Sequence, residues 1–174
     1  MILLFSVIVG IICLDQLSKW LAVIFLQGNA SFPIWQDVLH LTYAENRGMA
    51  FGLLADQRWI FMVLSTVAIA ALVFYMVRYR PQNVWLRLSL AMIVGGGIGN
   101  MIDRIFLGYV VDFIDFTLIN FPIFNVADSF VCVGAGILVV YLLWDTAREC
   151  KKEKEKKLAA QAESLKNDED GRVE

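Results

Sequence analysis

The chain has 174 residues, 59% of them hydrophobic, and a mean hydropathy of +0.63, which excludes an ordinary soluble domain. The formal net charge is only −2, but the charges are unevenly distributed, because residues 148–174 carry eight Lys/Arg and eight Asp/Glu. This pattern predicts a membrane domain over residues 1–147 and a charged, partly disordered tail over residues 148–174.

Four apolar segments are long enough to cross a hydrocarbon core of roughly 30 Å, which takes about 20 helical residues. They cover approximately residues 2–26, 59–77, 87–103 and 124–146. The first is too long for a secretory signal peptide and lacks a basic start and an A-x-A-like cleavage site, so we interpret it as a retained span. The sequence therefore predicts an all-α integral membrane protein with four transmembrane helices and an extended or β-like outer loop between helices 1 and 2.

The orientation of these spans follows from the positive charges in the short flanking segments. The connection 78–87 and the start of the tail together hold nine Lys/Arg, whereas the opposite loops, 27–58 and 104–123, hold three. Both termini are therefore predicted to be cytoplasmic, with the loops 27–58 and 104–123 on the outer side.

The first span contains Asp15 and Lys19 in "CLDQLSKW". They are four residues apart, so they share one helical face and can form an ion pair. We favour a structural role, in which this neutralised pair tethers helix 1 to its neighbours or to the outer interface. The alternative is a contribution to the active site, because charged residues inside a membrane are often functional.

The third span ends in "GGGIGNMIDR", residues 95–104. Its glycines allow another helix or a substrate backbone to approach closely. Asn100, Asp103 and Arg104 are spaced so that they share one face near the outer interface. The segment indicates either a functional site or a packing seam with an Asp–Arg interfacial anchor.

The second outer loop, "GYVVDFIDFTLINFPIF", is apolar, β-branched and aromatic. It is expected to lie along the membrane surface or to pack back between the helices. It contains Asp112 and Asp115, and residues three apart in an extended segment point to opposite faces. Only one of the two is therefore expected to face the fourth span, and the spacing alone leaves both open.

The fourth span is preceded by Pro122, which prevents a helix from running through the loop. Asn125 is well placed as its N-cap, with Asp128 one turn further on, just below the outer surface. Two nearby carboxyl groups in a low dielectric share a proton, so Asp128 and Asp112 or Asp115 could activate a water against a peptide carbonyl. The alternative is a buried acid pair held by Arg104 or by Asn side chains.

Other hydrolytic chemistries find little support in the sequence. His40 is the only histidine, there is no H-E-x-x-H motif and no G-x-S motif, and we interpret His40 as a surface loop residue. The three cysteines lie far apart with no C-x-x-C pair, which argues against a disulfide framework.

The motifs "LDQLSKW", "AENRGMAFG", "GNMIDR…GYVVDF" and "NFPIFNVAD" together resemble the lipoprotein signal peptidase family, signal peptidase II, over residues 15 to about 130. The resemblance implies a four-span aspartyl endopeptidase of the bacterial inner membrane, with its site near the outer face. Such an enzyme removes signal peptides from prolipoproteins, cutting before a cysteine that carries diacylglycerol. It also implies a monomer in contact with membrane lipids, without a metal, cofactor or nucleic-acid partner.

The resemblance carries site roles to individual positions. It implies that Asp112 and Asp128 are the catalytic pair, in preference to Asp115. The positions that line or support the family's site are Asn46, Gly48, Asn100, Arg104 and Asn125. Three further polar positions, Asp15, Lys19 and Asp103, are expected to be structural. Met49 stands where "NRGMAF" usually has a smaller residue.

Two other functional classes remain to be compared. In a proton-coupled transporter, Asp15, Asp103, Asp112 and Asp128 would form a relay across the membrane. Such a relay needs ionisable groups throughout the depth, whereas the acids here cluster near the predicted outer face. A structural scaffold would leave Asp112 and Asp128 unexplained.

Overall fold

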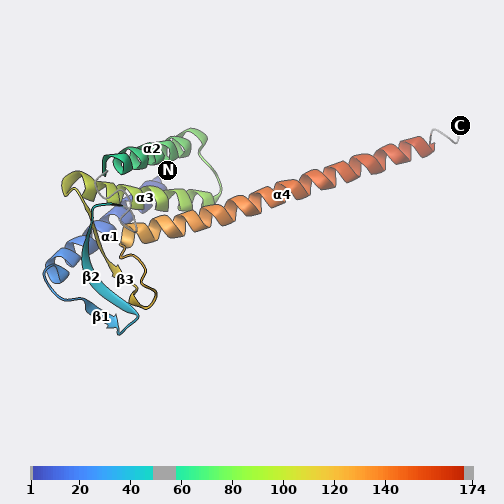
Figure 1. Ribbon diagram of the computed structural model, residues 1–174. Helices are drawn as coiled ribbons and strands as arrows, with labels where there is room; N and C mark the ends of the chain where they lie inside the picture. Colours follow the sequence, from blue (N-terminus) through green and yellow to red (C-terminus); the bar gives the residue numbers. More distant parts are fainter. Residues whose placement is uncertain (1, 49–57, 171–174) are drawn as a thin grey trace. The chain divides into compact units, whose positions relative to one another are not determined.

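The computed structural model describes residues 2–48 and 58–170. It contains two compact units, residues 1–137 and 138–174, which are described separately. Within the described residues, four helices are long and apolar enough to cross a membrane, and Figure 1 labels them in chain order. They are α1 (Ile2–Leu26), α2 (Arg58–Tyr79), α3 (Val84–Phe106) and α4 (Val126–Asp170). The prediction of four spans is confirmed, with ends that differ by a few residues.

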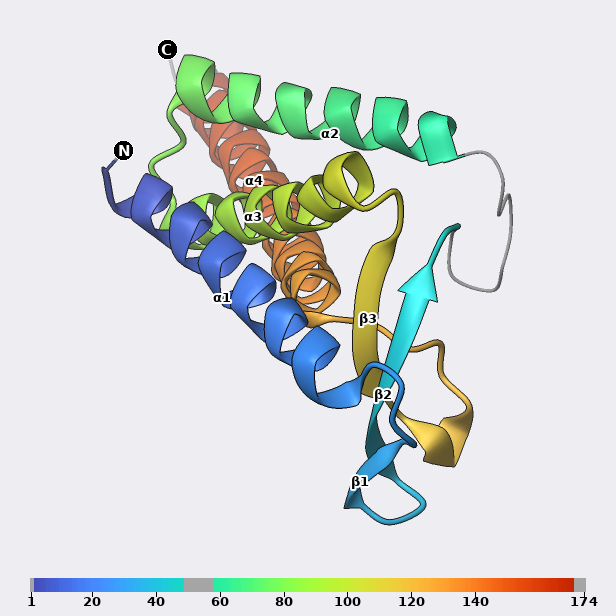
Figure 2. The same ribbon diagram turned by 90° about the vertical axis from the view of Figure 1, so that its left-hand side faces the viewer.

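Helix α3 lies between α1 and α2 in the first unit, and it is the most buried of the four candidate spans (Figure 2). Its glycines make this position possible. A methyl group at Gly99 would lie 2.6 Å from Asp15 Oδ2, and one at Gly96 would collide with the Ala127 carbonyl oxygen. The predicted role of the glycine run in close helix packing is therefore confirmed.

A small antiparallel sheet accompanies the helices, and β2 is its central strand (Figure 2). Its strands are β1 (Phe32–Trp35), β2 (Leu39–Asn46) and β3 (Val110–Asp115). The first two confirm the β-like loop predicted between helices 1 and 2. The third comes from the apolar loop after α3, and the sequence analysis did not identify β2 as its partner.

The chain returns from α3 to β3 through a tight helix end. The main-chain amides of Leu107 and Gly108 both donate to Asp103 O, at 2.7 and 3.2 Å. Gly108 has a φ of +84°, a left-handed conformation that glycine adopts without steric cost. This turn lets β3 begin at Val110, immediately beside the end of α3.

The two faces of β3 have different partners. Val111 and Phe113 form an apolar cluster with Ala22 of α1, so the alternation of the strand directs Asp112 to the opposite face. On its other edge, Ile114 exchanges main-chain hydrogen bonds with Phe124, at 2.8 and 3.0 Å. This pairing places Asn125, which follows Phe124 and precedes α4, beside the strand.

The second unit consists of the C-terminal part of α4, which is helical to Asp170. Exposed ion pairs one turn apart follow this helix, such as Lys152 with Glu149 and Lys157 with Glu153, both at 2.7 Å. Pairs of this kind each contribute little to stability. The division into a membrane domain and a tail at residue 147 stays a prediction.

Two glycines of α4 provide a test of the packing. A methyl group at Gly134 would lie 2.9 Å from Met92 Cβ and Ser89 O, whereas one at Gly136 meets nothing within 4 Å. We expect Gly134→Ala to lower the free energy of unfolding in detergent by about 1–3 kcal/mol. Gly136→Ala, the matched control two residues away, should leave it unchanged or raise it by up to about 1 kcal/mol. Equal effects of the two substitutions would contradict this packing of α3 and α4.

Candidate active site

Asp128 lies in the first turn of α4, where Asn125 holds it in place. The Asp128 main-chain amide donates to Asn125 Oδ1 at 2.9 Å, and Asn125 is fully buried. An Asn side chain that accepts from this amide is a favoured N-cap, because the first amides of a helix have no partner within it. The predicted N-cap is therefore confirmed.

Asp112 lies on β3 with 1% of its surface exposed, and two amide groups bind its carboxylate. Asn46 Nδ2 donates to Oδ2 at 2.9 Å, and Asn125 Nδ2 donates to Oδ1 at 2.6 Å. The Asn46 amide is itself oriented, since its Oδ1 accepts from the Gly48 main-chain amide at 3.1 Å. Both carboxylate oxygens of Asp112 are thus held by side chains from different segments.

Asn100 of α3 completes the connection between the two aspartates. Its Nδ2 donates to Asp128 Oδ1 at 2.7 Å, while its Oδ1 accepts from Asn125 Nδ2 at 3.1 Å. Asp112, Asn125, Asn100 and Asp128 therefore form one continuous hydrogen-bonded chain. β3, α3 and the start of α4 meet at this chain.

A cavity of about 670 Å³ opens beside this chain. Its polar lining consists of Asn46, Gly48, Ser65, Asn100, Arg104, Asp128 and Ser129. The Arg104 guanidinium contributes a positive charge, and its Nη1 donates to Asn100 O at 3.4 Å. The segment 121–124 supplies aromatic and aliphatic groups to the same cavity. The cavity lining thus combines polar and charged groups with apolar groups.

The environment of Asp112 favours its protonated form. Burial, and then the negative charge of Asp128, raise the pKa of Asp112 to about 6, although the hydrogen bonds from Asn46 and Asn125 oppose the shift. A carboxyl group with this pKa can hold a proton under conditions in which an exposed aspartate is fully ionised.

Asp115 lies on the same strand but outside this network. Its Oδ2 accepts from Thr42 Oγ1 of β2 at 2.8 Å, and it pairs in register with His40. The structure therefore brings Asp112, rather than Asp115, into contact with the groups around Asp128. His40 lies in strand β2, within the β-like loop predicted between helices 1 and 2, but it is half-buried rather than at the surface, and its Nδ1 contacts Ser31 Oγ at 3.1 Å.

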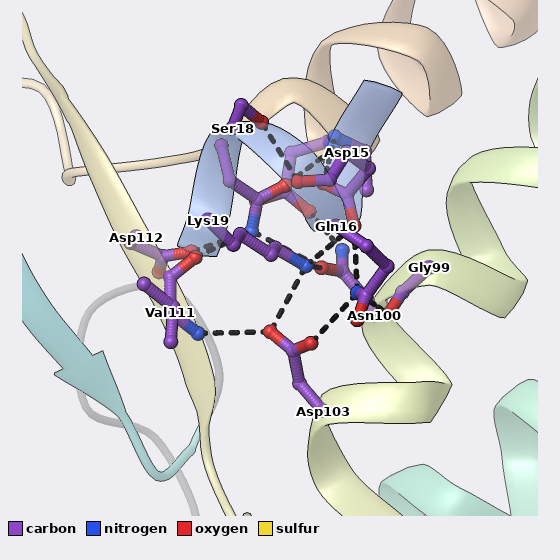
Figure 3. Close-up of polar contacts among 12 residues, drawn as sticks. Asp15, Gln16, Ser18, Lys19, Gly99, Asn100, Asp103, Val111 and Asp112 are labelled. Atoms are coloured by element: carbon purple, nitrogen blue, oxygen red, sulfur yellow. Dashed lines mark hydrogen bonds and ion pairs between the residues drawn. The ribbon is translucent and has the colours of Figure 1, made fainter. Parts of the chain in front are cut away.

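The charged residues of α1 form a buried cluster with α3, shown in Figure 3. Lys19 Nζ lies 2.8 Å from Asp15 Oδ2, which confirms the predicted pair, and 3.0 Å from Asp103 Oδ2. The Asp103–Arg104 anchor considered above is not formed, because neighbouring helical residues point in different directions. Asp103 faces Lys19, while Arg104 faces the cavity.

Gln16 of α1 was not among the residues predicted from the sequence. Its Nε2 donates to Asp103 Oδ1 at 2.9 Å and to Gly99 O at 3.2 Å, so it joins the buried cluster (Figure 3). The available signal was an amide side chain within an apolar span, where hydrogen bonds between helices are the usual reason for its presence. Met49, the departure noted in the first outer loop, lies outside the described residues.

Among the residues described, no group of three or more His, Cys, Asp or Glu side chains is arranged to hold a metal ion. The arrangement that the structure does contain is a pair of carboxyl groups beside an open cavity, linked by oriented amides. Such a pair can remove a proton from a water molecule and donate a hydrogen bond to a carbonyl oxygen.

Comparison with known proteins relates this chain to a family. The family described as signal peptidase (SPase) II matches residues 7–144. A lipoprotein signal peptidase of Halalkalibacterium halodurans is 47% identical over 147 residues, covering 83% of this chain and 93% of the relative. One from Brevibacillus brevis is 44% identical over 135 residues, covering 78% of this chain and 91% of the relative.

Solved structures are similar as well. A bacterial membrane enzyme determined by the in meso method at 2.3 Å resolution superimposes with a TM-score of 0.79 and 29% sequence identity. The match covers 85% of this chain and 92% of that one. A second such structure, at 1.9 Å resolution, has a TM-score of 0.75 and the same identity, covering 82% of this chain and 94% of that one.

The two functions of Asn125 can be separated by substitution. Serine at this position retains an N-cap oxygen but is too short to reach Asp112, whereas alanine provides neither. We expect Asn125→Ala to be less stable than Asn125→Ser by about 0.5–2 kcal/mol, measured by thermal unfolding in detergent. Both variants should lose most of the peptidase activity, because neither side chain can donate to the Asp112 carboxylate. Equal stability of the two variants would contradict the capping role.

Proposed function

Because the chain belongs to the signal peptidase II family of aspartic peptidases, we propose that Asp112 and Asp128 are its catalytic pair. Its function is that of a lipoprotein signal peptidase, and it is a multi-pass bacterial membrane protein. The observation that supports the proposal is the hydrogen-bonded chain from Asp112 through Asn125 and Asn100 to Asp128, beside the cavity.

In the proposed mechanism Asp112 holds the proton and Asp128 is ionised. The Asp128 carboxylate removes a proton from a water molecule as its oxygen attacks the scissile carbonyl carbon. Protonated Asp112 donates a hydrogen bond to the carbonyl oxygen, where negative charge develops. The C–N bond then breaks, and the proton taken up by Asp128 passes to the leaving nitrogen. The products are a free carboxyl group and a new amino terminus.

We infer the substrate from the family and from the character of the cavity. Its relatives are lipoprotein signal peptidases, which implies prolipoprotein substrates, and we propose cleavage immediately before a cysteine that carries diacylglycerol. The apolar lining residues 121–124 suit acyl chains, while the polar lining residues suit a peptide. The connection 78–87 and the start of the tail hold more Lys/Arg than the loops 27–58 and 104–123, which supports cytoplasmic termini and a site near the outer face of the inner membrane.

The polar residues around the pair have separate proposed roles. Asn46 and Asn125 hold the Asp112 carboxyl group, and Asn100 holds that of Asp128. Gly48 orients Asn46 through its main-chain amide. Arg104, whose charge faces the cavity, is proposed to bind carbonyl or ester oxygens of the substrate.

Cleavage of a purified diacylglyceryl-modified prolipoprotein in detergent tests the catalytic pair. Asp112→Asn and Asp128→Asn should each lower kcat at least about 100-fold, because each removes a group that transfers or shares a proton. Asp115→Asn is the matched control, since it exchanges a carboxylate on the same strand, and it should stay within about twofold of wild type.

The same assay with EDTA examines the requirement for a metal. Wild type and Asp115→Asn should cleave with EDTA present, because the proposed water is activated by a carboxylate. Normal turnover by Asp112→Asn or Asp128→Asn would reject the pair. An inactive wild type on a verified substrate would reject the proposed cleavage.

The pH dependence of kcat/KM provides a further test. Since Asp112 has a pKa of about 6 and must be protonated to assist the carbonyl, kcat/KM should fall as the pH rises through about 6. The hydrogen bond from Asn46 lowers this pKa, so Asn46→Ala should raise it and move the fall to higher pH. A kcat/KM that increases with pH through this range would contradict the assignment of the proton to Asp112.

A further inference from the structure

The buried ions of α1 and α3 contact the main chain at two particular places. Asp15 Oδ1 accepts from the main-chain amide of Ala127 at 2.9 Å, and Asp103 Oδ2 accepts from that of Val111 at 3.1 Å. Ala127 immediately precedes Asp128, and Val111 immediately precedes Asp112. Each buried carboxylate therefore holds the backbone one residue before a proposed catalytic aspartate.

We propose that Asp15, Lys19, Asp103 and Gln16 are positioning residues that together set the separation and orientation of Asp112 and Asp128. We refer to these four residues as the positioning cluster. The inference rests on the proposed catalytic pair and assigns its members a role in turnover beyond that of a structural tether.

The Asp15 contact holds the start of α4. The first amides of a helix have no acceptor within the helix, and Asn125 already accepts from Asp128 N. Asp15 accepts from the adjacent amide, Ala127 N, and its negative charge lies favourably at the positive end of the helix. The position of the Asp128 backbone relative to α1 is therefore defined by a buried, charge-assisted hydrogen bond.

The Asp103 contact holds β3. The Val111 main-chain amide reaches Asp103 Oδ2 at the end of α3, and both residues are almost completely buried (Figure 3). The other carboxylate oxygen, Oδ1, accepts from Gln16 Nε2 at 2.9 Å. With both oxygens bound, the Asp103 side chain has little freedom, so the strand segment before Asp112 is held at a defined distance from α3.

Lys19 joins the two contacts. Its ammonium group has three donors, and these reach Asp15 Oδ2 at 2.8 Å, Asp103 Oδ2 at 3.0 Å and Asn100 Oδ1 at 2.8 Å. Because Lys19 cannot accept a hydrogen bond, the Asn100 oxygen must face it, and Asn100 Nδ2 must face Asp128. Lys19 thus links the two backbone contacts. It also orients the Asn100 side chain so that its NH₂ group, rather than its oxygen, faces Asp128.

A cluster that served only to stabilise the helices would not need these main-chain contacts. Ion pairs between α1 and α3 alone would hold those two helices together. The additional bonds extend from the cluster to β3 and to the start of α4, the two segments that carry the proposed catalytic pair. Misplacement of reacting groups by about 1 Å can cost roughly 100-fold in rate, so loosening either contact should affect turnover.

The test measures kcat and KM per folded enzyme, with diacylglyceryl-modified prolipoprotein in detergent, well below each variant's unfolding temperature. Asp103→Asn weakens the link to Lys19 and Val111, and we expect kcat to fall about 10- to 100-fold with KM within about twofold. Asp115→Asn, the same exchange on β3 without a link to the cluster, should retain the wild-type kcat.

Gln16→Leu is the second variant, because it changes no charge and touches neither proposed catalytic residue. It should lower kcat by about 3- to 10-fold at unchanged KM. This variant decides the inference if Asp103→Asn does not fold. Values of kcat within twofold of wild type in the folded cluster variants would overturn the inference.

The outcomes separate this inference from the proposed function. An inactive wild type, or a fully active Asp112→Asn, would reject the catalytic pair and the inference together. If wild type cleaves and Asp112→Asn does not, but the cluster variants match Asp115→Asn, only the inference is overturned.

Discussion

The arrangement of the site depends first on the buried ion pairs that the Lys19 ammonium group forms with the carboxylates of Asp15 and Asp103. An isolated charge in this environment would be very costly, but all three of its donors have acceptors on Asp15, Asp103 and Asn100. The close approach that this requires explains a neighbouring glycine, since a side chain at Gly99 would displace the Asp15 carboxylate. Charge pairing and helix packing therefore constrain each other at the same place.

The orientation of the side-chain amides of Asn100 and Asn125 depends on neighbouring donor groups, of which the Lys19 ammonium group is one. An amide side chain can present either its oxygen or its nitrogen, and each orientation here is determined by a neighbour that can only donate. Lys19 determines the orientation of Asn100, and the main-chain amide of Asp128 determines that of Asn125. Both therefore direct NH₂ groups at the carboxylates. This keeps two acids close together in a low dielectric without leaving either without hydrogen bonds.

The small sheet also positions the two aspartates, because β3 carries Asp112 and β2 carries Asn46, which binds it. Its apolar face packs on α1 through Val111 and Phe113, and its alternation directs Asp112 to the opposite face, where Asn125 at the start of α4 binds it. The main-chain pairing of Ile114 with Phe124 then brings the start of α4 beside the strand. Residues of β2, α2, α3, the segment 121–124 and the start of α4 line one cavity beside this network, and its lining combines polar with apolar groups.

The four spans, the Asp15–Lys19 pair and the N-cap at Asn125 could be predicted from the sequence, because hydropathy, helical spacing and capping are local properties. Residue spacing left Asp112 and Asp115 open, and only the family resemblance favoured Asp112. The structure places Asp112 in the Asp128 network and pairs Asp103 with Lys19 rather than with Arg104. The role of Gln16 also emerged only there. The reason is physical: which face of a strand or helix meets a given neighbour depends on strand pairing and helix contacts between residues remote in the chain, and no local pattern specifies them.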